Sequence, residues 1–141
     1  MNVRQRHNPL IPELYCSDFG RSLRFYRDVL GFALVYERPE ERFAFLDRGG
    51  AQLMIEQPVD AARTWLAGDL SHPYGRGISL QIEVPDVSEV HEAVIAYGAE
   101  ILVPLEDRSY RVGEAIRTSR QFVLLDPDGY LLRFFEDCGG A

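Results

Sequence analysis

Several residue types are scarce in this sequence, and each shortage excludes a class of protein. The two cysteines, Cys16 and Cys138, are too few for a disulfide framework and form no CxxC pair. All fifteen basic residues are arginine, so a lysine Schiff base is excluded. No apolar run approaches the roughly 18 residues of a membrane helix, and the first ten residues contain no apolar signal core. We therefore expect a soluble, cytoplasmic protein.

Positive charge is also in deficit. The 22 acidic residues exceed the 15 basic ones, which gives a net charge of −7. Phosphate backbones and anionic membrane surfaces repel such a chain, so we expect neither nucleic acid nor membrane as a partner. The long-range field favours a cationic ligand instead. The 141 residues, 46% of them apolar, are the size of one domain with its own core.

The sequence does contain an internal repeat. In the first copy a predicted strand precedes a helix that begins at Asp18 and ends at Gly31, and three more predicted strands follow. In the second copy the corresponding helix begins at Asp86 and ends at Gly98. The predicted strands span residues 10–16, 33–36, 42–47 and 51–57 in the first copy, and 78–84, 101–105, 121–126 and 130–135 in the second.

Each copy is thus a βαβββ module. We predict an α+β fold in which two such modules pair into a curved eight-stranded sheet with a shared concave surface. The modules would span residues 8–57 and 76–137 of a single domain, 8–137, with a connector at 58–75. The second copy is about 11 residues longer, and the extra residues are predicted as a loop around 106–120.

Three segments carry a family resemblance: SDFGRSLRFYRDVLGF, RFAFLDRGGAQLMIEQ and QFVLLDPDGYLLRF. They resemble the vicinal oxygen chelate superfamily, which includes glyoxalase I, extradiol dioxygenases and bleomycin-resistance proteins. The resemblance extends over about residues 8–136. Because this fold hosts several activities, the function has to be inferred from the site.

The resemblance implies a divalent metal on the first and last strands of each module. The corresponding positions here are Ile11, Met54, Ser79 and Arg133. An aliphatic chain has no lone pair, a thioether and a hydroxyl are poor ligands for these ions, and a guanidinium repels them. We therefore expect no bound metal, no cofactor and no catalytic residue, and binding rather than enzymatic activity.

Strand alternation predicts which side chains line the concave face. Glu13, Glu56 and Glu83 against Arg133 make this face acidic, and unpaired polar groups there need solvent or a ligand. The predicted ligand-binding residues are Glu13, Tyr15, Met54, Glu56, Trp65, Gln81, Tyr110, Arg133 and Phe135.

An acidic chain without the metal ligands, with Pro12 in its first strand, is most similar to the bleomycin-resistance proteins. That resemblance implies a homodimer that exchanges its N-terminal strands and confers antibiotic resistance by sequestering a cationic drug. One feature departs from it, because Thr118 stands near the position where those proteins have a tryptophan. Trp65, Tyr110 or Tyr36 would have to replace that ring.

Two alternatives remain open. Glu13, Glu56 and Gln81 are candidate ligands of a displaced metal, which would make the chain a glyoxalase- or dioxygenase-type enzyme. Arg111, Arg117 and Arg120 make the predicted loop positive, which favours an anion over a cationic drug and leaves room for another small ligand.

Overall fold

The computed structural model describes residues 7–59 and 63–140, and it divides into two compact units, which we call unit 1 and unit 2. Unit 1 ends at Ser71 and unit 2 begins at His72. None of the helices in these ranges is long and apolar enough to cross a membrane.

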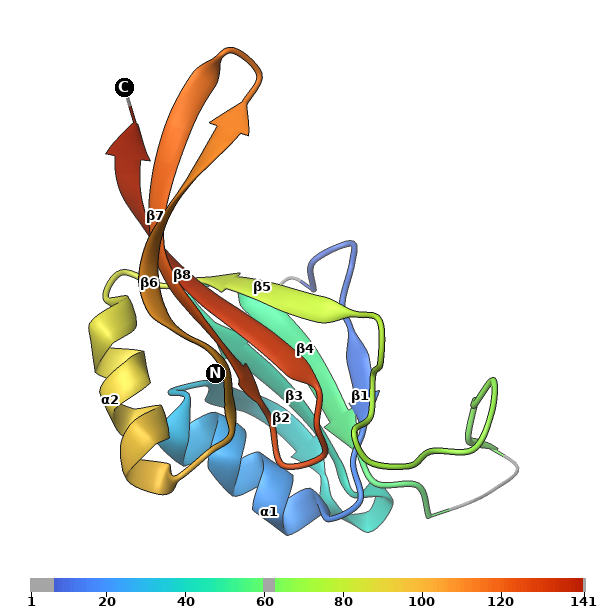
Figure 1. The fold of residues 1–141 in the computed structure, drawn as a ribbon. Helices are drawn as coiled ribbons and strands as arrows, with labels where there is room; N and C mark the ends of the chain where they lie inside the picture. Colours follow the sequence, from blue (N-terminus) through green and yellow to red (C-terminus); the bar gives the residue numbers. More distant parts are fainter. Residues whose placement is uncertain (1–6, 60–62, 141) are drawn as a thin grey trace. The chain divides into compact units, whose positions relative to one another are not determined.

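Unit 1 holds β1 to β4, with one helical segment after β1 (Figure 1). Its sheet has the order β1-β4-β3-β2, with β1 parallel to β4. The elements are β1 (Glu13–Tyr15), α1 (Phe19–Arg24), a π-helical turn (Phe25–Val29), β2 (Ala33–Arg38), a 3₁₀ turn (Pro39–Glu41), β3 (Phe43–Arg48) and β4 (Ala51–Glu56).

Unit 2 repeats this topology. Its sheet has the order β5-β8-β7-β6, with β5 parallel to β8. The elements are β5 (Ser79–Glu83), α2 (Val87–Tyr97), β6 (Ile101–Val112), β7 (Ala115–Leu125) and β8 (Leu131–Gly140). The two βαβββ modules and the α+β class are therefore confirmed, with the eight strands hydrogen-bonded as two sheets of four. Part of the predicted connector, residues 60–62, lies outside the described residues, and the single domain over 8–137 stays a prediction.

The helix boundaries follow from local chemistry. The carboxylate of Asp18 accepts a hydrogen bond from the Arg21 amide at 3.1 Å, and Asp86 does the same for Glu89 at 3.3 Å. Helix α2 ends at Gly98, whose φ of 87° is a left-handed cap. The first helix differs from expectation, because its second half is π-helical, with the Leu30 amide bonded to the Phe25 carbonyl. Phe25 and its neighbour Tyr26, both in this π-helical segment, are buried.

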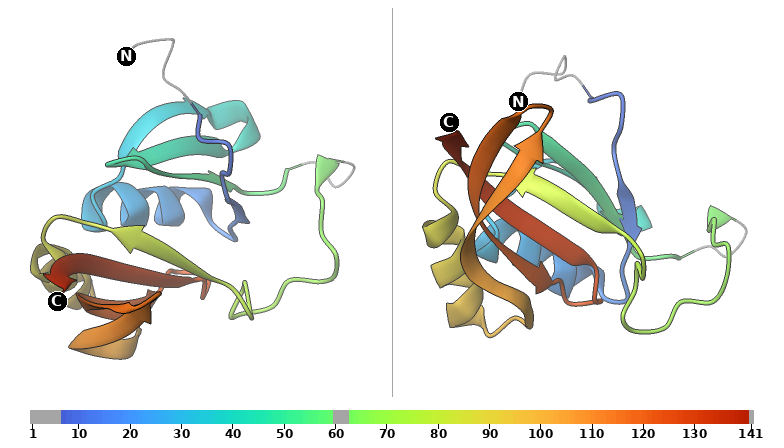
Figure 2. Two further views of the ribbon diagram at one scale, coloured as in Figure 1. Left: turned by 90° about the horizontal axis from the view of Figure 1, so that it is seen from above. Right: turned by 45° about the horizontal axis from the view of Figure 1, so that its top comes forward.

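Each sheet buries one face under its own helix. In unit 1, α1 packs against one face of the sheet (Figure 2, left), where it contacts β4. Leu53 and Ile55 of β4 are buried. In unit 2, Leu132 and Phe134 lie under α2, and Phe122 stacks on Phe134 with ring centroids 5.9 Å apart. Alternation therefore leaves Met54 and Glu56, or Arg133 and Phe135, on the opposite face of each sheet.

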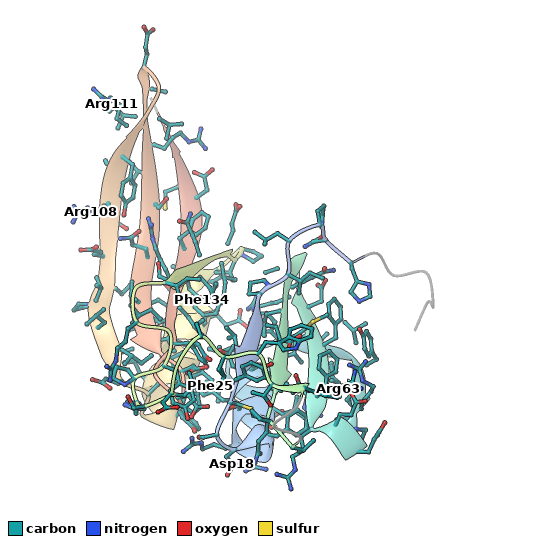
Figure 3. The ribbon with its side chains drawn as sticks, turned by 90° about the vertical axis from the view of Figure 1, so that its right-hand side faces the viewer. Asp18, Phe25, Arg63, Arg108, Arg111 and Phe134 are labelled. Carbon is teal, nitrogen blue, oxygen red and sulfur yellow. The ribbon has the colours of Figure 1, made fainter. Side chains whose placement is uncertain are left out.

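The predicted loop around 106–120 is wrong. This segment is a β-hairpin, because β6 and β7 stay paired from Asp107↔Arg120 to Val112↔Ala115, and β8 runs alongside to Gly140. The hairpin extends beyond the end of β5 (Figure 1), and Figure 3 shows Arg108 and Arg111 on it. Cross-strand polar pairs hold it together, such as Ser109 with Thr118 at 2.9 Å. A polar β-hairpin and a polar loop have similar compositions, so the composition of residues 106–120 could not distinguish between them.

Candidate functional site

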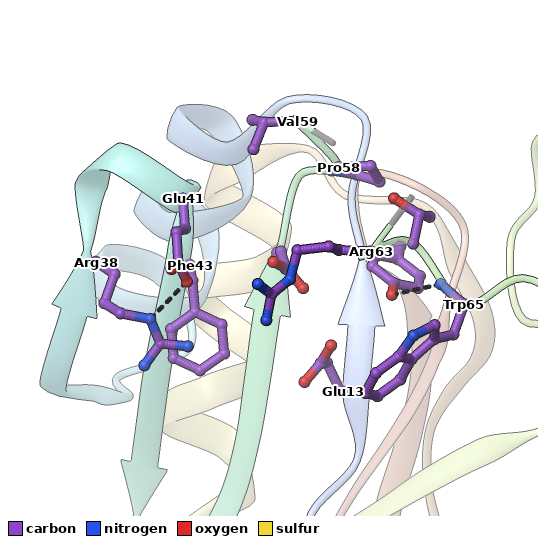
Figure 4. Close-up of a pocket in the computed structure, with 11 residues that line it drawn as sticks. Glu13, Arg38, Glu41, Phe43, Pro58, Val59, Arg63 and Trp65 are labelled. Atoms are coloured by element: carbon purple, nitrogen blue, oxygen red, sulfur yellow. Dashed lines mark hydrogen bonds and ion pairs between the residues drawn. The ribbon is translucent and has the colours of Figure 1, made fainter. Parts of the chain in front are cut away.

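The face of unit 1 opposite α1 contains a groove with a volume of about 380 Å³ (Figure 4). It combines three carboxylates, two arginines and three aromatic rings with a few smaller side chains. The residues that line it are Glu13, Tyr15, Arg38, Glu41, Phe43, Glu56, Pro58, Val59, Arg63, Thr64 and Trp65.

Strand pairing explains how the acidic residues meet. Glu13 and Tyr15 are two apart on β1, so both side chains leave the same face. The parallel register places Tyr15 opposite Glu56 and Glu13 opposite Met54. Glu13 and Glu56 therefore line the same groove from adjacent strands. The three-residue strand β1 thus places Glu13 in the same groove as Glu56 of β4.

The aromatic residues come from β3 and from the connector. Phe43 is buried at 2% exposure, and the Arg38 guanidinium lies 4.0 Å above its ring centroid. Arg38 also donates to a carboxylate oxygen of Glu41 at 2.6 Å. Trp65 is 83% exposed, and its backbone amide donates to the Tyr15 hydroxyl at 3.0 Å. The indole therefore stands beside the carboxyl pair with its surface free for stacking.

The groove is acidic by one charge when Glu13, Glu41 and Glu56 are weighed against Arg38 and Arg63. Partial burial raises the pKa of Glu56 above the ordinary carboxyl value. The neighbouring carboxyl of Glu13 and the negative charge of Glu41 raise the pKa of Glu56 further, whereas the Arg38 charge lowers it. Glu56 therefore keeps its proton to a higher pH than an ordinary carboxyl group does.

The raised pKa of Glu56 predicts a pH-dependent cost in stability. A carboxyl whose pKa is higher in the folded than in the unfolded chain stabilises the fold in acid, and this contribution is lost as pH rises through the folded pKa. Glu56→Gln cannot ionise, so we expect it to be more stable than the parent at neutral pH and to lose that advantage in acid. Urea unfolding across the pH range measures this; a variant less stable than the parent at neutral pH would contradict it.

In unit 2, the predicted residues form a different arrangement. Arg133 donates to Gln121 Oε1 from Nε at 3.0 Å and from Nη2 at 2.7 Å, and its Nη1 donates to Gln81 at 3.2 Å. The Tyr110 hydroxyl donates to the same Gln121 oxygen at 2.8 Å, and the Arg133 guanidinium lies 5.1 Å from the Tyr110 ring centroid. Gln121 in turn donates to Glu106 at 3.0 Å. Arg133 and Tyr110 are thus held by their own sheet.

The positions that the superfamily uses for metal do not fit a divalent ion. Arg133 fills its position with a hydrogen-bonded guanidinium, and Ser79 offers only a hydroxyl. Ile11 and Met54 supply an aliphatic chain and a thioether. Over residues 7–59 and 63–140, no three or more His, Cys, Asp or Glu side chains group closely enough to hold a metal ion.

The structure brings four of the nine predicted binding residues into the groove: Glu13, Tyr15, Glu56 and Trp65. Met54 lies on the same face of the sheet, and Phe135 pairs with the position of Gln121 on β7. Sequence reasoning missed Arg38, Glu41, Phe43, Pro58, Val59, Arg63 and Thr64. Continuing the alternation from Glu56 across the register to Phe43, and from there to Arg38, would have found two of them.

The positive charge predicted for the 106–120 segment is mostly neutralised. Arg120 pairs with Asp107 at 2.9 Å, and Arg117 pairs with Asp137. The Arg120 hydrogen bond lowers the pKa of Asp107, and the Gly139 amide and Arg117 together lower the pKa of Asp137. Both acids therefore stay ionised, so the segment favours an anionic ligand less than its sequence implied.

The structure defines an α+β protein in which a βαβββ module occurs twice. A profile of the Glyoxalase/Bleomycin resistance protein/Dioxygenase superfamily matches residues 10–134, and the chain belongs to this superfamily. It is 30% identical over 143 residues to a bleomycin resistance protein from Geobacillus stearothermophilus, covering 89% of this chain and 94% of that one. A lactoylglutathione lyase from Haemophilus influenzae is 30% identical over 128 residues, 88% of either chain. The crystal structure of TioX from Micromonospora sp. ML1 is 26% identical with a TM-score of 0.70, covering 92% of this chain and 98% of that one.

Proposed function

We propose that this chain is a non-catalytic binding protein that sequesters a bleomycin-like antibiotic, with the groove of unit 1 holding its cationic part. The observation that carries the proposal is the pairing of two adjacent carboxyl groups, Glu13 and Glu56, with the exposed indole of Trp65. The carboxyl groups attract a cation, and a flat ring can stack on the indole. The bleomycin resistance relatives support this ligand class.

The proposal includes a homodimer in the cytoplasm and a role for unit 2. The side chains of Gln81, Arg133 and Phe135 lie on one face of the second sheet, where Gln81 is exposed. These side chains would offer hydrogen bonds and a ring contact to a ligand at that face of unit 2. Sedimentation of the protein with and without drug tests the dimer.

The direct test is a calorimetric titration of the purified protein with bleomycin, together with metal analysis of the same batch. Saturable binding at micromolar Kd or tighter, without stoichiometric metal, is the expected result. The lyase relative makes a metal-dependent enzyme the second candidate. Stoichiometric metal would favour that candidate, and the absence of any heat would overturn the proposed ligand.

Trp65 gives the proposal a second, optical test. It is the only tryptophan in the chain, so ligand binding in the groove should change the intrinsic fluorescence directly. Trp65→Ala should weaken bleomycin binding about tenfold, since stacking and cation–π contacts contribute about 1–2 kcal/mol. Tyr97→Ala, which removes a half-exposed ring from α2, is the matched control and should leave the affinity unchanged. If the parent and Trp65→Ala bound bleomycin with equal affinity, the indole would not be part of the binding site.

A further inference from the structure

Strand β6 forms an edge of the unit 2 sheet. It pairs with β7 on one side and stands last in the sheet order, so no strand of residues 7–59 and 63–140 is hydrogen-bonded to its other side. The backbone groups on that side are free to pair with another strand. Pro104 has no amide proton to offer, and the register with β7 is regular only from Glu106 to Val112. Residues 106–112 are therefore the part of this edge that another strand can extend.

The same segment carries charged side chains that its own chain leaves unpaired. The β6–β7 hairpin contains four arginines, and two of them pair with acids of neighbouring strands. The other two, Arg108 and Arg111, are exposed on β6 (Figure 3), and neither side chain has a hydrogen bond or ion pair in the part of the chain that the structure describes. Edge strands often use charge to prevent pairing. Here both signs occur within one segment, EDRSYRV, so it can complement a second copy of itself.

A second copy fits this edge in one register. Residues directly opposite each other in an antiparallel pair lie on the same face of the sheet, so the two-fold axis relating two copies has to pass through a residue. An axis at any charged residue of the segment would oppose two identical charges, which is unfavourable. An axis at Tyr110 or Val112 would leave the unpaired arginines opposite no acid. An axis at Ser109 places Asp107 opposite Arg111 of the partner subunit.

This register provides contacts on both faces of the sheet. On one face, the Asp107 carboxylate accepts from Arg120 at 2.9 Å and keeps lone pairs for a second guanidinium, which Arg111 of the partner subunit supplies. On the other face, Arg108 lies opposite the ring of Tyr110 of the partner subunit, where a cation–π contact can form. Two-fold symmetry gives each contact twice.

We infer that two copies of this chain associate through β6, with residues 106–112 running antiparallel to the same residues of the second copy about a two-fold axis at Ser109. The sheet of unit 2 then continues across the axis as eight strands, four from each copy. This inference rests on the proposed function, because it names the interface of the homodimer proposed there. It places that interface at β6 rather than at the exchanged N-terminal strands that the family resemblance implies.

A disulfide across the axis tests the register. In a Cys138→Ser background, which removes the exposed thiol and leaves Cys16 buried, Ser109→Cys places two thiols opposite each other. Opposite Cα atoms in an antiparallel pair are about 4.5–5.5 Å apart, a separation that a disulfide spans. We expect a disulfide-linked dimer after mild oxidation, seen on a non-reducing gel. The control is Val112→Cys in the same background. This exposed position lies opposite Glu106 of the partner subunit, about 20 Å from its own copy, and should not cross-link.

Charge reversal tests the ion pair between the copies. Arg111→Glu sets a carboxylate opposite Asp107 at two symmetric positions, so the dissociation constant of the dimer should rise about tenfold or more at low salt. Arg27→Glu makes the same change of charge at an exposed arginine of unit 1 and should leave that constant unchanged. Sedimentation equilibrium measures both constants, and circular dichroism confirms that both variants are folded.

The outcomes distinguish this inference from the proposed function. If the parent is a dimer but Ser109→Cys does not cross-link, or Arg111→Glu dimerises as tightly as the parent, the interface lies elsewhere; the inference fails and the homodimer stands. If the parent is a monomer at every concentration, the inference and the homodimer fail together. If Ser109→Cys cross-links and bleomycin gives no heat of binding, the β6 interface is supported and only the proposed ligand is wrong.

Discussion

Replacing both groove carboxyls, in the double variant Glu13→Gln with Glu56→Gln, should weaken the binding of bleomycin about 100-fold. Glu56 is half-buried, and its charged contact with a cation contributes about 2 kcal/mol, to which the exposed Glu13 adds up to about 1 kcal/mol. The sum of about 3 kcal/mol corresponds to that change in Kd. Glutamine keeps the shape of the side chain and its hydrogen-bonding capacity, so the loss of affinity measures the contribution of the negative charge. Calorimetric titration at neutral pH and low salt measures it.

The control for this variant removes the same total charge from the same unit. Glu37 and Glu40 are exposed and lie outside the groove lining. The double variant Glu37→Gln with Glu40→Gln should change the affinity less than about twofold, because solvent and salt screen exposed charges. Equal losses in the two double variants would mean that only the overall charge of the chain attracts the ligand, and that the groove is not its site.

Replacing Gly129 by alanine should destabilise unit 2 by about 3 kcal/mol or more, by steric overlap and an unfavourable backbone angle. Its φ is +98°, and a Cβ there would stand 2.5 Å from Pro73 Cβ and 2.6 Å from Pro73 Cα. This turn joins β7 to β8 and is tightly bonded. Asp126 accepts from the amides of Asp128 and Tyr130, and the Tyr74 amide donates to the Asp128 carbonyl. The turn therefore has little room to shift.

Gly113 provides the comparison, since it also has a positive φ, +64°, at the turn of the β6–β7 hairpin. A Cβ at Gly113 would meet nothing within 4 Å. Gly113→Ala should therefore cost only about 1 kcal/mol, the backbone strain alone. Urea unfolding of both variants measures the difference. Equal losses would show that the close approach of Pro73 to the β7–β8 turn does not constrain it.

The groove and the fold make opposite demands on Glu56. Its raised pKa means that the folded chain is less stable when this carboxyl is ionised, whereas the cationic ligand proposed above would bind best to the ionised form. A ligand that supplies positive charge removes this conflict. Stability at neutral pH should therefore increase on ligand binding, by the amount that mass action dictates.

Local patterns in the sequence determined the repeated module and its helix boundaries. Asp18 and Asp86 each offer a carboxylate to a free helix amide, and Gly98 adopts a backbone angle that other residues resist. Alternation along β1 and β4 also placed Glu13, Tyr15 and Glu56 on one face. These features depend on residues a few positions apart, so composition and spacing reveal them.

Only the tertiary structure decided which residues complete the groove. Arg38, Glu41 and Phe43 reach Glu13 through the pairing of four strands, and Trp65 is placed by a hydrogen bond to Tyr15, fifty residues away in sequence. Likewise, the partners of Arg117 and Arg120 come from neighbouring strands, and these contacts turn an apparent loop into a hairpin. Spacing along the chain specifies which face a side chain takes, but strand order and register specify its neighbours, and those depend on the whole sheet.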